Sequence, residues 1–138
     1  MSKEFLQKKI EQITTLLVEL RSILDRPFDA FQNDPVVVHA AERDFQLTID
    51  LASDINSHIL VEKGGPIPDS YHQSFIALAK ADIIPGHLAR HLVESAKLRN
   101  ILVHEYDFEE DYRRFYESAK SFLPLYQQYL EAIQKYIS

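Results

Sequence analysis

Residues 108–136 read FEEDYRRFYESAKSFLPLYQQYLEAIQKY and give the clearest signal of fold class in the chain. The apolar residues alternate steps of four and three: Phe108, Tyr112, Phe115, Ala119, Phe122, Tyr126, Tyr129, Ile133 and Tyr136. This spacing lays one apolar stripe along a helix, and other elements must cover it. Asp107 and Glu110 resemble a capping box, so we expect the helix to begin there. Pro124 lies inside the stripe and predicts a kink.

The preceding sequence repeats this helical pattern in four more segments. A first helix is predicted from Ser2 to Asp25, and a second follows the cap Asn33-Asp34-Pro35 and ends at Lys63-Gly64-Gly65-Pro66. A short helix is predicted over Ser70–Ala81, and a third long helix begins at Pro85. The stripes of the first, second and third long helices are Leu6, Ile10, Ile13, Leu17, Leu20 and Leu24; Val38, Ala41, Phe45, Thr48, Ala52, Ile55 and Ile59; and Leu88, Leu92, Leu98 and Leu102.

The segment pattern predicts an all-α fold in a single domain over residues 1–138. No period-two run bounded by turn residues indicates a strand, and no linker divides the chain. The expected architecture is an up-and-down bundle of four long helices plus one short helix. The apolar and aromatic faces also leave room for a self-association surface, and the heptad spacing of the first and last helices fits either internal packing, which we favour, or a dimer seam.

Composition excludes several classes of protein. Fifteen basic and 21 acidic residues give a formal net charge of −6, which argues against a protein covered with positive charge for packaging nucleic acid. Without cysteine there is no disulfide, thiolate zinc site, iron–sulfur cluster or cysteine nucleophile. No apolar run approaches the ~20 residues of a membrane span, and Met1 leads into charged residues, so we expect a cytoplasmic protein without membrane contact.

Metal and cofactor motifs are weak or missing. The Glu-x-x-His pairs of di-iron bundles do not occur. His87 and His91 share a helix face, yet two imidazoles without a carboxylate make a poor metal site, and solvated surface histidines are the better interpretation. Gly64-Gly65 lacks the lysine and spacing of a phosphate-binding loop. We therefore expect neither a metal nor a cofactor.

The stretch 98–106, LRNILVHEY, is the one place where several polar groups interrupt an apolar helix. Arg99 stands where the stripe predicts an apolar residue, and Asn100 and His104 are four apart, so the amide can position the imidazole. Arg99 and His104 are five apart and diverge by roughly 140° on an ideal helix. Either the helix loosens near His104, or two copies pool their side chains across a two-fold axis. Alternatively, Arg99 bridges to a neighbouring carboxylate, and His104 and Tyr106 are satisfied at the edge of the bundle.

These residues resemble the HepT-like ribonuclease family, which is part of the HEPN group of helical domains. Its motif is Arg-x4-His-x-Tyr with Asn after the Arg, and Arg99, Asn100, His104 and Tyr106 match it position by position. The resemblance covers most of the chain, since further stretches are similar: Ser70-Tyr71 and Phe75, Ile83-Ile84-Pro85, and Phe122-Leu123-Pro124.

The resemblance implies a metal-independent endoribonuclease that acts as the toxin of a toxin–antitoxin pair. Its partner would be a minimal nucleotidyltransferase antitoxin that silences it by attaching AMP to Tyr106. The resemblance also implies a homodimer whose active site takes motifs from both chains. The substrate would be RNA, with tRNA among the candidates.

The residue types fit this chemistry. RNA is cleaved when its 2′-hydroxyl attacks the adjacent phosphorus, and this step needs a proton shuttle and a cation. His104 can move a proton near neutral pH, and Arg99 offers a fork of donors to phosphate oxygens. Asn100 would orient the imidazole or a phosphate, and Tyr106 would contact RNA. The alternatives are a non-catalytic subunit that docks onto a nucleotidyltransferase, and a helical dimerisation module without chemistry.

Overall fold

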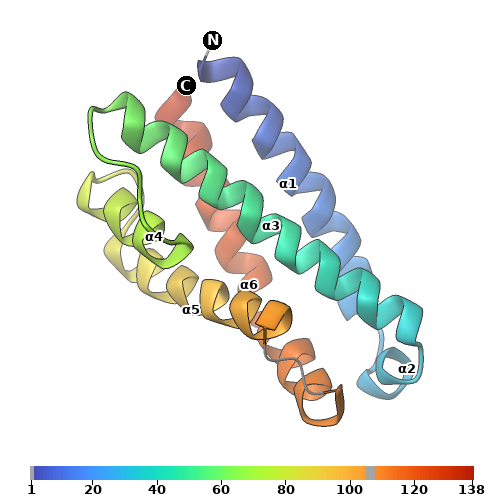
Figure 1. Ribbon diagram of the computed structural model, residues 1–138. Coiled ribbons are helices and arrows are strands. Elements are labelled where there is room, and N and C mark those ends of the chain that lie inside the picture. Colours follow the sequence, from blue (N-terminus) through green and yellow to red (C-terminus); the bar gives the residue numbers. More distant parts are fainter. Residues whose placement is uncertain (1, 105–107) are drawn as a thin grey trace.

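The computed structural model describes residues 2–104 and 108–138, with side chains from 3–104 and 112–138, and is helical throughout (Figure 1). Within these ranges six helices follow one another and no strand occurs. They are α1 (Ser2–Leu24), α2 (Phe28–Gln32), α3 (Pro35–Glu62), α4 (Tyr71–Lys80), α5 (Gly86–His104) and α6 (Phe108–Ile137). The predicted all-α class is confirmed.

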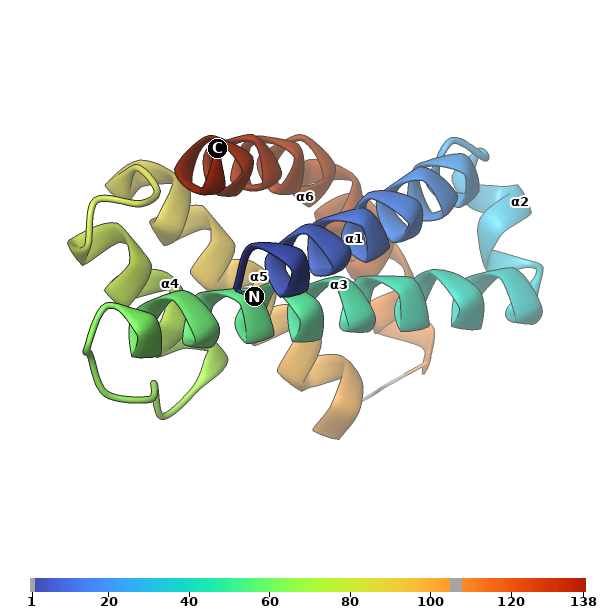
Figure 2. The same ribbon diagram turned by 90° about the horizontal axis from the view of Figure 1, so that it is seen from above.

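The four long helices α1, α3, α5 and α6 form the body of the bundle (Figures 1 and 2). Helix α1 packs on α3 and α6, and α6 also packs on α5. The short helix α4 lies against α3 and α5, and α2 contacts one end of α3 and of α6. The predicted four long helices and one short helix are all present, and α2 is an additional turn.

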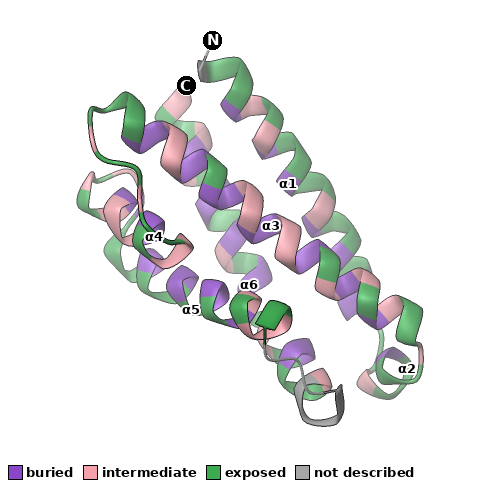
Figure 3. Ribbon diagram, viewed as in Figure 1, coloured by how far each residue is buried: buried purple, intermediate pink, exposed green. Residues whose placement is uncertain are grey.

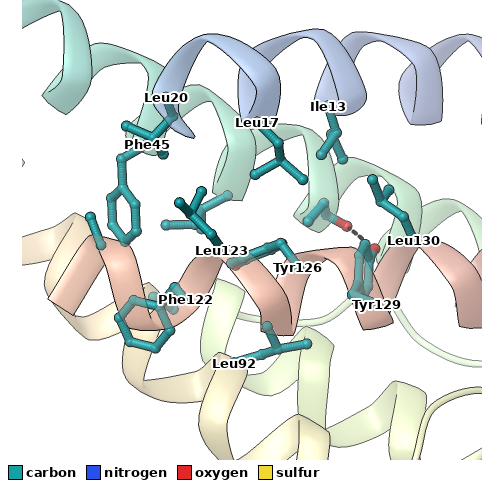
Figure 4. Packing of buried hydrophobic residues seen from close by; sticks show 14 of the residues in the cluster. Ile13, Leu17, Leu20, Phe45, Leu92, Phe122, Leu123, Tyr126, Tyr129 and Leu130 are labelled. Carbon is teal, nitrogen blue, oxygen red and sulfur yellow. Dashed lines mark hydrogen bonds between the residues drawn. The ribbon is translucent and has the colours of Figure 1, made fainter. Parts of the chain in front are cut away.

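The predicted stripes form the core of the bundle (Figure 3). Every stripe residue of α1 and α3 is buried, and the α6 stripe is buried from Phe115 to Ile133, whereas Tyr136 is exposed. In Figure 4, Tyr126 and Tyr129 of α6 lie between side chains of the neighbouring helices. Burial of these faces is the main favourable contribution to folding.

The ends of α3 follow the sequence signals. The Asp34 carboxylate accepts a hydrogen bond from the Val37 N–H at 3.3 Å, and Pro35 occupies the first turn. At the other end Gly64 takes the left-handed conformation, with φ of 86°, and Gly65 donates its N–H to the Leu60 carbonyl at 2.9 Å. The predicted cap and the predicted glycine stop are both confirmed.

Helix α2 was not expected from the sequence, because five residues are too few to show a period. Its side chains enter an aromatic cluster: Phe28 and Phe31 lie 5.3 Å and 5.1 Å from the ring of Tyr116 on α6. The Tyr116 hydroxyl donates to the Arg26 carbonyl at 2.5 Å. Contacts with α6 thus stabilise a turn that is too short to be stable alone.

Helix α6 continues through Pro124, which cannot donate a backbone hydrogen bond there. The kink expected at this position stays a prediction, and the capping residue Asp107 lies outside the described residues. Within the described ranges, no helix has the length and apolar character needed to cross a membrane.

Candidate active site

Arg99 of α5 lies at the junction of α5 with α3. Its Nε–H donates to Oδ1 of Asp50 on α3 at 3.2 Å, and the two side chains are only 17% and 28% exposed. The structure thus confirms the alternative expectation that Arg99 pairs with a neighbouring carboxylate, and a catalytic role of Arg99 stays a prediction. Because both charges are largely shielded from water, this pair interacts more strongly than an exposed one.

Tyr71 covers one face of the Arg99 guanidinium. The guanidinium carbon lies 4.9 Å from the centre of the tyrosine ring, which is a cation–π contact. Burial, followed by a hydrogen bond to Asp50, raises the pKa of the Tyr71 phenol. The hydroxyl therefore stays protonated beside the Asp50 carboxylate.

Asn100 is exposed and contacts its neighbour in sequence. Its Oδ1 accepts a hydrogen bond from Nη1 of Arg99 at 3.3 Å. The sequence predicted that the amide positions His104 or a phosphate. In the structure the amide oxygen contacts the arginine, and the predicted role of Asn100 towards His104 or a phosphate stays a prediction.

His104 is the last residue of α5 and is exposed, as is Val103 before it (Figure 3). Helix α5 is α-helical without interruption from Gly86 to His104, so it does not loosen before the histidine. Arg99 and His104 therefore diverge by roughly 140° within one chain. Figure 2 shows the end of α5 projecting past α3 and out of the bundle, which leaves the histidine accessible.

Tyr106, the predicted AMP acceptor, lies outside the described residues. Of the four predicted site residues, the structure thus places three, all in the last two turns of α5. Arg99 and Asn100 are brought together, and His104 stands apart on another side of the same helix.

The other histidines show no metal-binding arrangement. Among the described residues, no group of three or more histidine, aspartate or glutamate side chains could hold a metal ion. His87 and His91 are both exposed on α5. His58 stacks on Phe5 at 4.4 Å, and its Nε2 lies 3.6 Å from a carboxylate oxygen of Glu62.

The positive charge near the motif is small. Lys97 forms an exposed ion pair with Glu94 at 3.0 Å, which reduces its effect on an approaching phosphate. A surface groove of about 560 Å³ between α4 and α5 contains Arg90 and Lys80, and its lining includes neither Arg99 nor His104. This groove is therefore separate from the Arg99 site.

Sequence reasoning missed Asp50, and it noted Tyr71 only as part of the family resemblance. Asp50 borders the apolar stripe of α3 in the same way as Asp54, so periodicity does not separate the two. Only the packing of α3 against α5 reveals which of these carboxylates meets Arg99.

Comparison with known proteins adds independent findings. The sequence profile of the family described as Ribonuclease HepT-like matches residues 10–133. A relative described as the tRNA nuclease HepT of Aphanizomenon flos-aquae is 30% identical over 132 residues, which is 96% of this chain and 89% of the relative.

Solved structures of low sequence identity share the fold. A chain in the crystal structure of a mutant MntA-HpeT toxin–antitoxin complex is 22% identical, covers 96% of this chain and 98% of its own, and has a TM-score of 0.83. A structure described as the tri-AMPylated Shewanella oneidensis HEPN toxin with its MNT antitoxin is 22% identical, with 89% and 96% covered and a TM-score of 0.69. The profile match spans nearly the whole helical bundle, and this chain belongs to the ribonuclease HepT-like family.

Proposed function

We propose that this chain is a metal-independent endoribonuclease that uses Arg99 and His104. The observation that carries the proposal is the contrast within α5: a shielded arginine held in one direction by Asp50, and an exposed histidine at the end of the same helix. A fixed cation and an accessible proton carrier are the two groups that cleavage of RNA by its own 2′-hydroxyl requires. Membership of the HepT-like family, with a relative described as a tRNA nuclease, supports the same conclusion.

In this reaction the 2′-oxygen bonds to phosphorus as the bond from phosphorus to the 5′-oxygen breaks. His104 takes the proton of the 2′-hydroxyl or gives one to the leaving 5′-oxygen. The Arg99 guanidinium donates hydrogen bonds to the phosphate oxygens, where negative charge develops. The products are a 2′,3′-cyclic phosphate and a free 5′-hydroxyl, so no metal-bound water is needed.

The active site is proposed to form between two copies of the chain. The uninterrupted course of α5 directs Arg99 and His104 to different sides, so one chain does not aim both at one phosphate. The exposed end of α5, which projects from the bundle in Figure 2, can meet its equivalent across a two-fold axis. In such a dimer the arginine of one chain and the histidine of the other face the same phosphate.

An RNA-cleavage assay with chelator tests the reaction. Purified protein free of modification should cut tRNA or mRNA equally well with and without chelator, and His104→Ala should lower the rate by roughly 10²- to 10⁴-fold. His91→Ala is the matched control, because His91 is also an exposed histidine of α5. Intact RNA after incubation with unmodified protein would contradict the enzymatic function and favour a docking subunit of a nucleotidyltransferase.

Mixing two inactive variants tests the shared site. In a dimer of Arg99→Ala with His104→Ala, one of the two composite sites retains both groups. In an equal mixture after full subunit exchange, half of the dimers are such heterodimers, so activity should return to about a quarter of the wild-type level by the geometry of a two-fold axis. If each active site lay within a single chain, the mixture would stay inactive. That result would refute the site shared by two chains but not the proposed reaction.

We further propose that the protein is a toxin silenced by a minimal nucleotidyltransferase that attaches AMP to Tyr106. Support comes from the motif match and from the resemblance in fold to a toxin described as AMPylated and bound to its antitoxin. Mass spectrometry after co-expression with the neighbouring nucleotidyltransferase should detect added AMP. Tyr106→Phe should prevent the addition and restore toxicity. An unmodified protein that the partner still neutralises would refute this mechanism.

A further inference from the structure

Asp50 on α3 contacts two side chains from two other helices. Its Oδ1 accepts the Nε–H of Arg99 at 3.2 Å, and its carboxylate also acts on the Tyr71 phenol, whose pKa it helps to raise. Asp50 is 28% exposed and Arg99 17% exposed, so water competes little for this bond. One carboxylate thus links α3, α4 and α5 at the candidate site.

Tyr71 is itself held in place by the start of α4. The Ser70 hydroxyl oxygen caps the helix by accepting the Gln73 N–H at 3.1 Å, and the Ser74 hydroxyl donates to the Tyr71 carbonyl at 2.7 Å. Ser74 is fully buried, so the backbone of Tyr71 rests on the core. The ring over Arg99 is therefore part of a fixed surface, and it blocks one face of the guanidinium.

The contacts on Arg99 use particular edges of the guanidinium. Asp50 takes Nε–H, and Asn100 takes one Nη1 hydrogen, so these two bonds use two of the five N–H donors of an arginine. With one face covered by Tyr71, the plane of the fork is set as well. The three donors that these bonds leave over, one on Nη1 and two on Nη2, therefore lie in a plane that the neighbouring side chains set.

We infer that Asp50 and Tyr71 are positioning residues, which fix the Arg99 guanidinium so that its remaining donors meet the scissile phosphate. This inference rests on the proposed ribonuclease function. Neither residue touches the reacting atoms, and both act through Arg99. Misplacement of a catalytic group by about 1 Å can cost 10²-fold in rate, so the order of this side chain bears directly on turnover.

The first test measures the order of Arg99 without reference to activity. The Nε–Hε signal of Arg99 in the nitrogen-15 NMR spectrum of the full chain is assigned by its loss in Arg99→Lys. Its exchange with water should be slow in the wild type and at least ten-fold faster in Asp50→Ala. Asp54→Asn is the matched control, because Asp54 lies one turn further along α3 and pairs instead with Lys9. Unchanged exchange in Asp50→Ala overturns the inference.

The second test separates a positioning role from a purely structural one by steady-state RNA cleavage. Asp50→Ala should lower kcat by roughly 10- to 100-fold, whereas Asp50→Asn, which keeps an acceptor oxygen, should recover part of that loss. Tyr71→Phe keeps the ring over Arg99 and loses the hydroxyl, so a loss of about two- to ten-fold is expected. In an Arg99→Ala background, Asp50→Ala should have almost no further effect, because both changes remove the same function.

The outcomes distinguish the inference from the function on which it rests. Wild-type cleavage combined with a full rate in Asp50→Ala refutes the positioning role and leaves the ribonuclease in place. Absence of cleavage by the wild type refutes the ribonuclease, and the NMR exchange rate still decides whether Asp50 orders Arg99. Thermal unfolding measures how much of each variant is folded. If the loss of activity in both Asp50→Ala and Asp50→Asn equals the loss of folded protein, the ion pair is purely structural and the inference is refuted.

Discussion

Two polar clusters link α3 to α4, and they differ in nearly every physical property. The cluster of Asn56, Ser74 and Tyr129 is fully buried and neutral. Asn56 donates to the Ser74 hydroxyl at 3.0 Å, and the Tyr129 hydroxyl donates to Asn56 Oδ1 at 2.5 Å. The cluster of Asp50, Tyr71 and Arg99 is charged and partly open to solvent.

The difference indicates how a helical bundle separates stability from chemistry. In the neutral cluster the hydrogen bonds join groups of the protein to one another, and burial raises the pKa of Tyr129 well above its ordinary range, so the cluster keeps one protonation state. In the charged cluster, a cation is held by only part of its donors, and its side chain and that of Asp50 are partly exposed. A substitution in the first should affect unfolding, and a substitution in the second should affect turnover.

Arg99→Lys should produce the largest effect and only in turnover. Lysine keeps the positive charge but lacks the planar fork that Asp50 and Tyr71 hold. RNA cleavage should fall by roughly 10²-fold, which corresponds to about 2.7 kcal/mol of transition-state stabilisation. The midpoint of thermal unfolding should stay close to that of the wild type. A comparable loss of stability would remove the proposed distinction between the clusters.

Asn56→Ala should produce the opposite result. The substitution removes partners of Ser74 and Tyr129 in a site without access to water, so the free energy of unfolding should fall by roughly 2 kcal/mol. Urea denaturation measures this loss. The rate of RNA cleavage per folded molecule should change less than about two-fold, because the contacts of Asn56 do not take part in the reaction. A large loss of rate would mean that a change in the buried cluster affects Arg99 through the contact between Ser74 and Tyr71.

Asp44 tests a third case, a buried carboxyl group that lacks a cation. It is 7% exposed, and burial, followed by the charge of Glu19 and a hydrogen bond with it, raises its pKa from 3.8 to about 6. The folded protein therefore binds this proton more tightly than the unfolded chain does. Stability from this group is present at low pH and is lost as the pH rises through about 6.

Lowering the pH from 7.5 to 5 should thus increase the Asp44 contribution to the free energy of unfolding by roughly 1 kcal/mol. Asp44→Asn should be more stable than the wild type at pH 7.5, and the difference between the two proteins should shrink at pH 5. Urea denaturation at both pH values measures it. If the free energies of unfolding of the two proteins differed by the same amount at both pH values, the pKa of Asp44 would not be raised in the folded state.

Periodicity predicted the bundle because the spacing of apolar residues within each helix shows which face is buried. The stripe through Phe45 on α3 and that through Tyr126 on α6 needed no knowledge of the partner helix. Helix α2 was missed for the opposite reason, since its stability comes from rings on α6 rather than from its own sequence.

The candidate site was predictable only in part. The motif supplied Arg99 and His104, and the helical angle between them indicated that one straight helix does not aim both at one point; the uninterrupted course of α5 removes the alternative of a loosened helix. Asp50 was not predictable, because α3 carries several carboxylates and their sequence positions do not say which faces α5. The sequence of one chain does not show which of its surfaces would meet a second copy, so the arrangement of the dimer site stays a prediction.

The smallest effect is expected at Asp54. Its substitution compares an exposed ion pair with the partly buried pair of Asp50 and Arg99. Asp54 pairs with Lys9 at 3.5 Å, but its side chain is 56% exposed, twice the exposure of Asp50. Water screens this pair, and holding Lys9 in one conformation costs side-chain entropy. Asp54→Asn should therefore change the free energy of unfolding by less than about 0.5 kcal/mol and leave RNA cleavage intact. A loss of turnover here, equal to that of Asp50→Asn, would mean that negative charge along α3 in general, rather than contact with Arg99, supports the reaction.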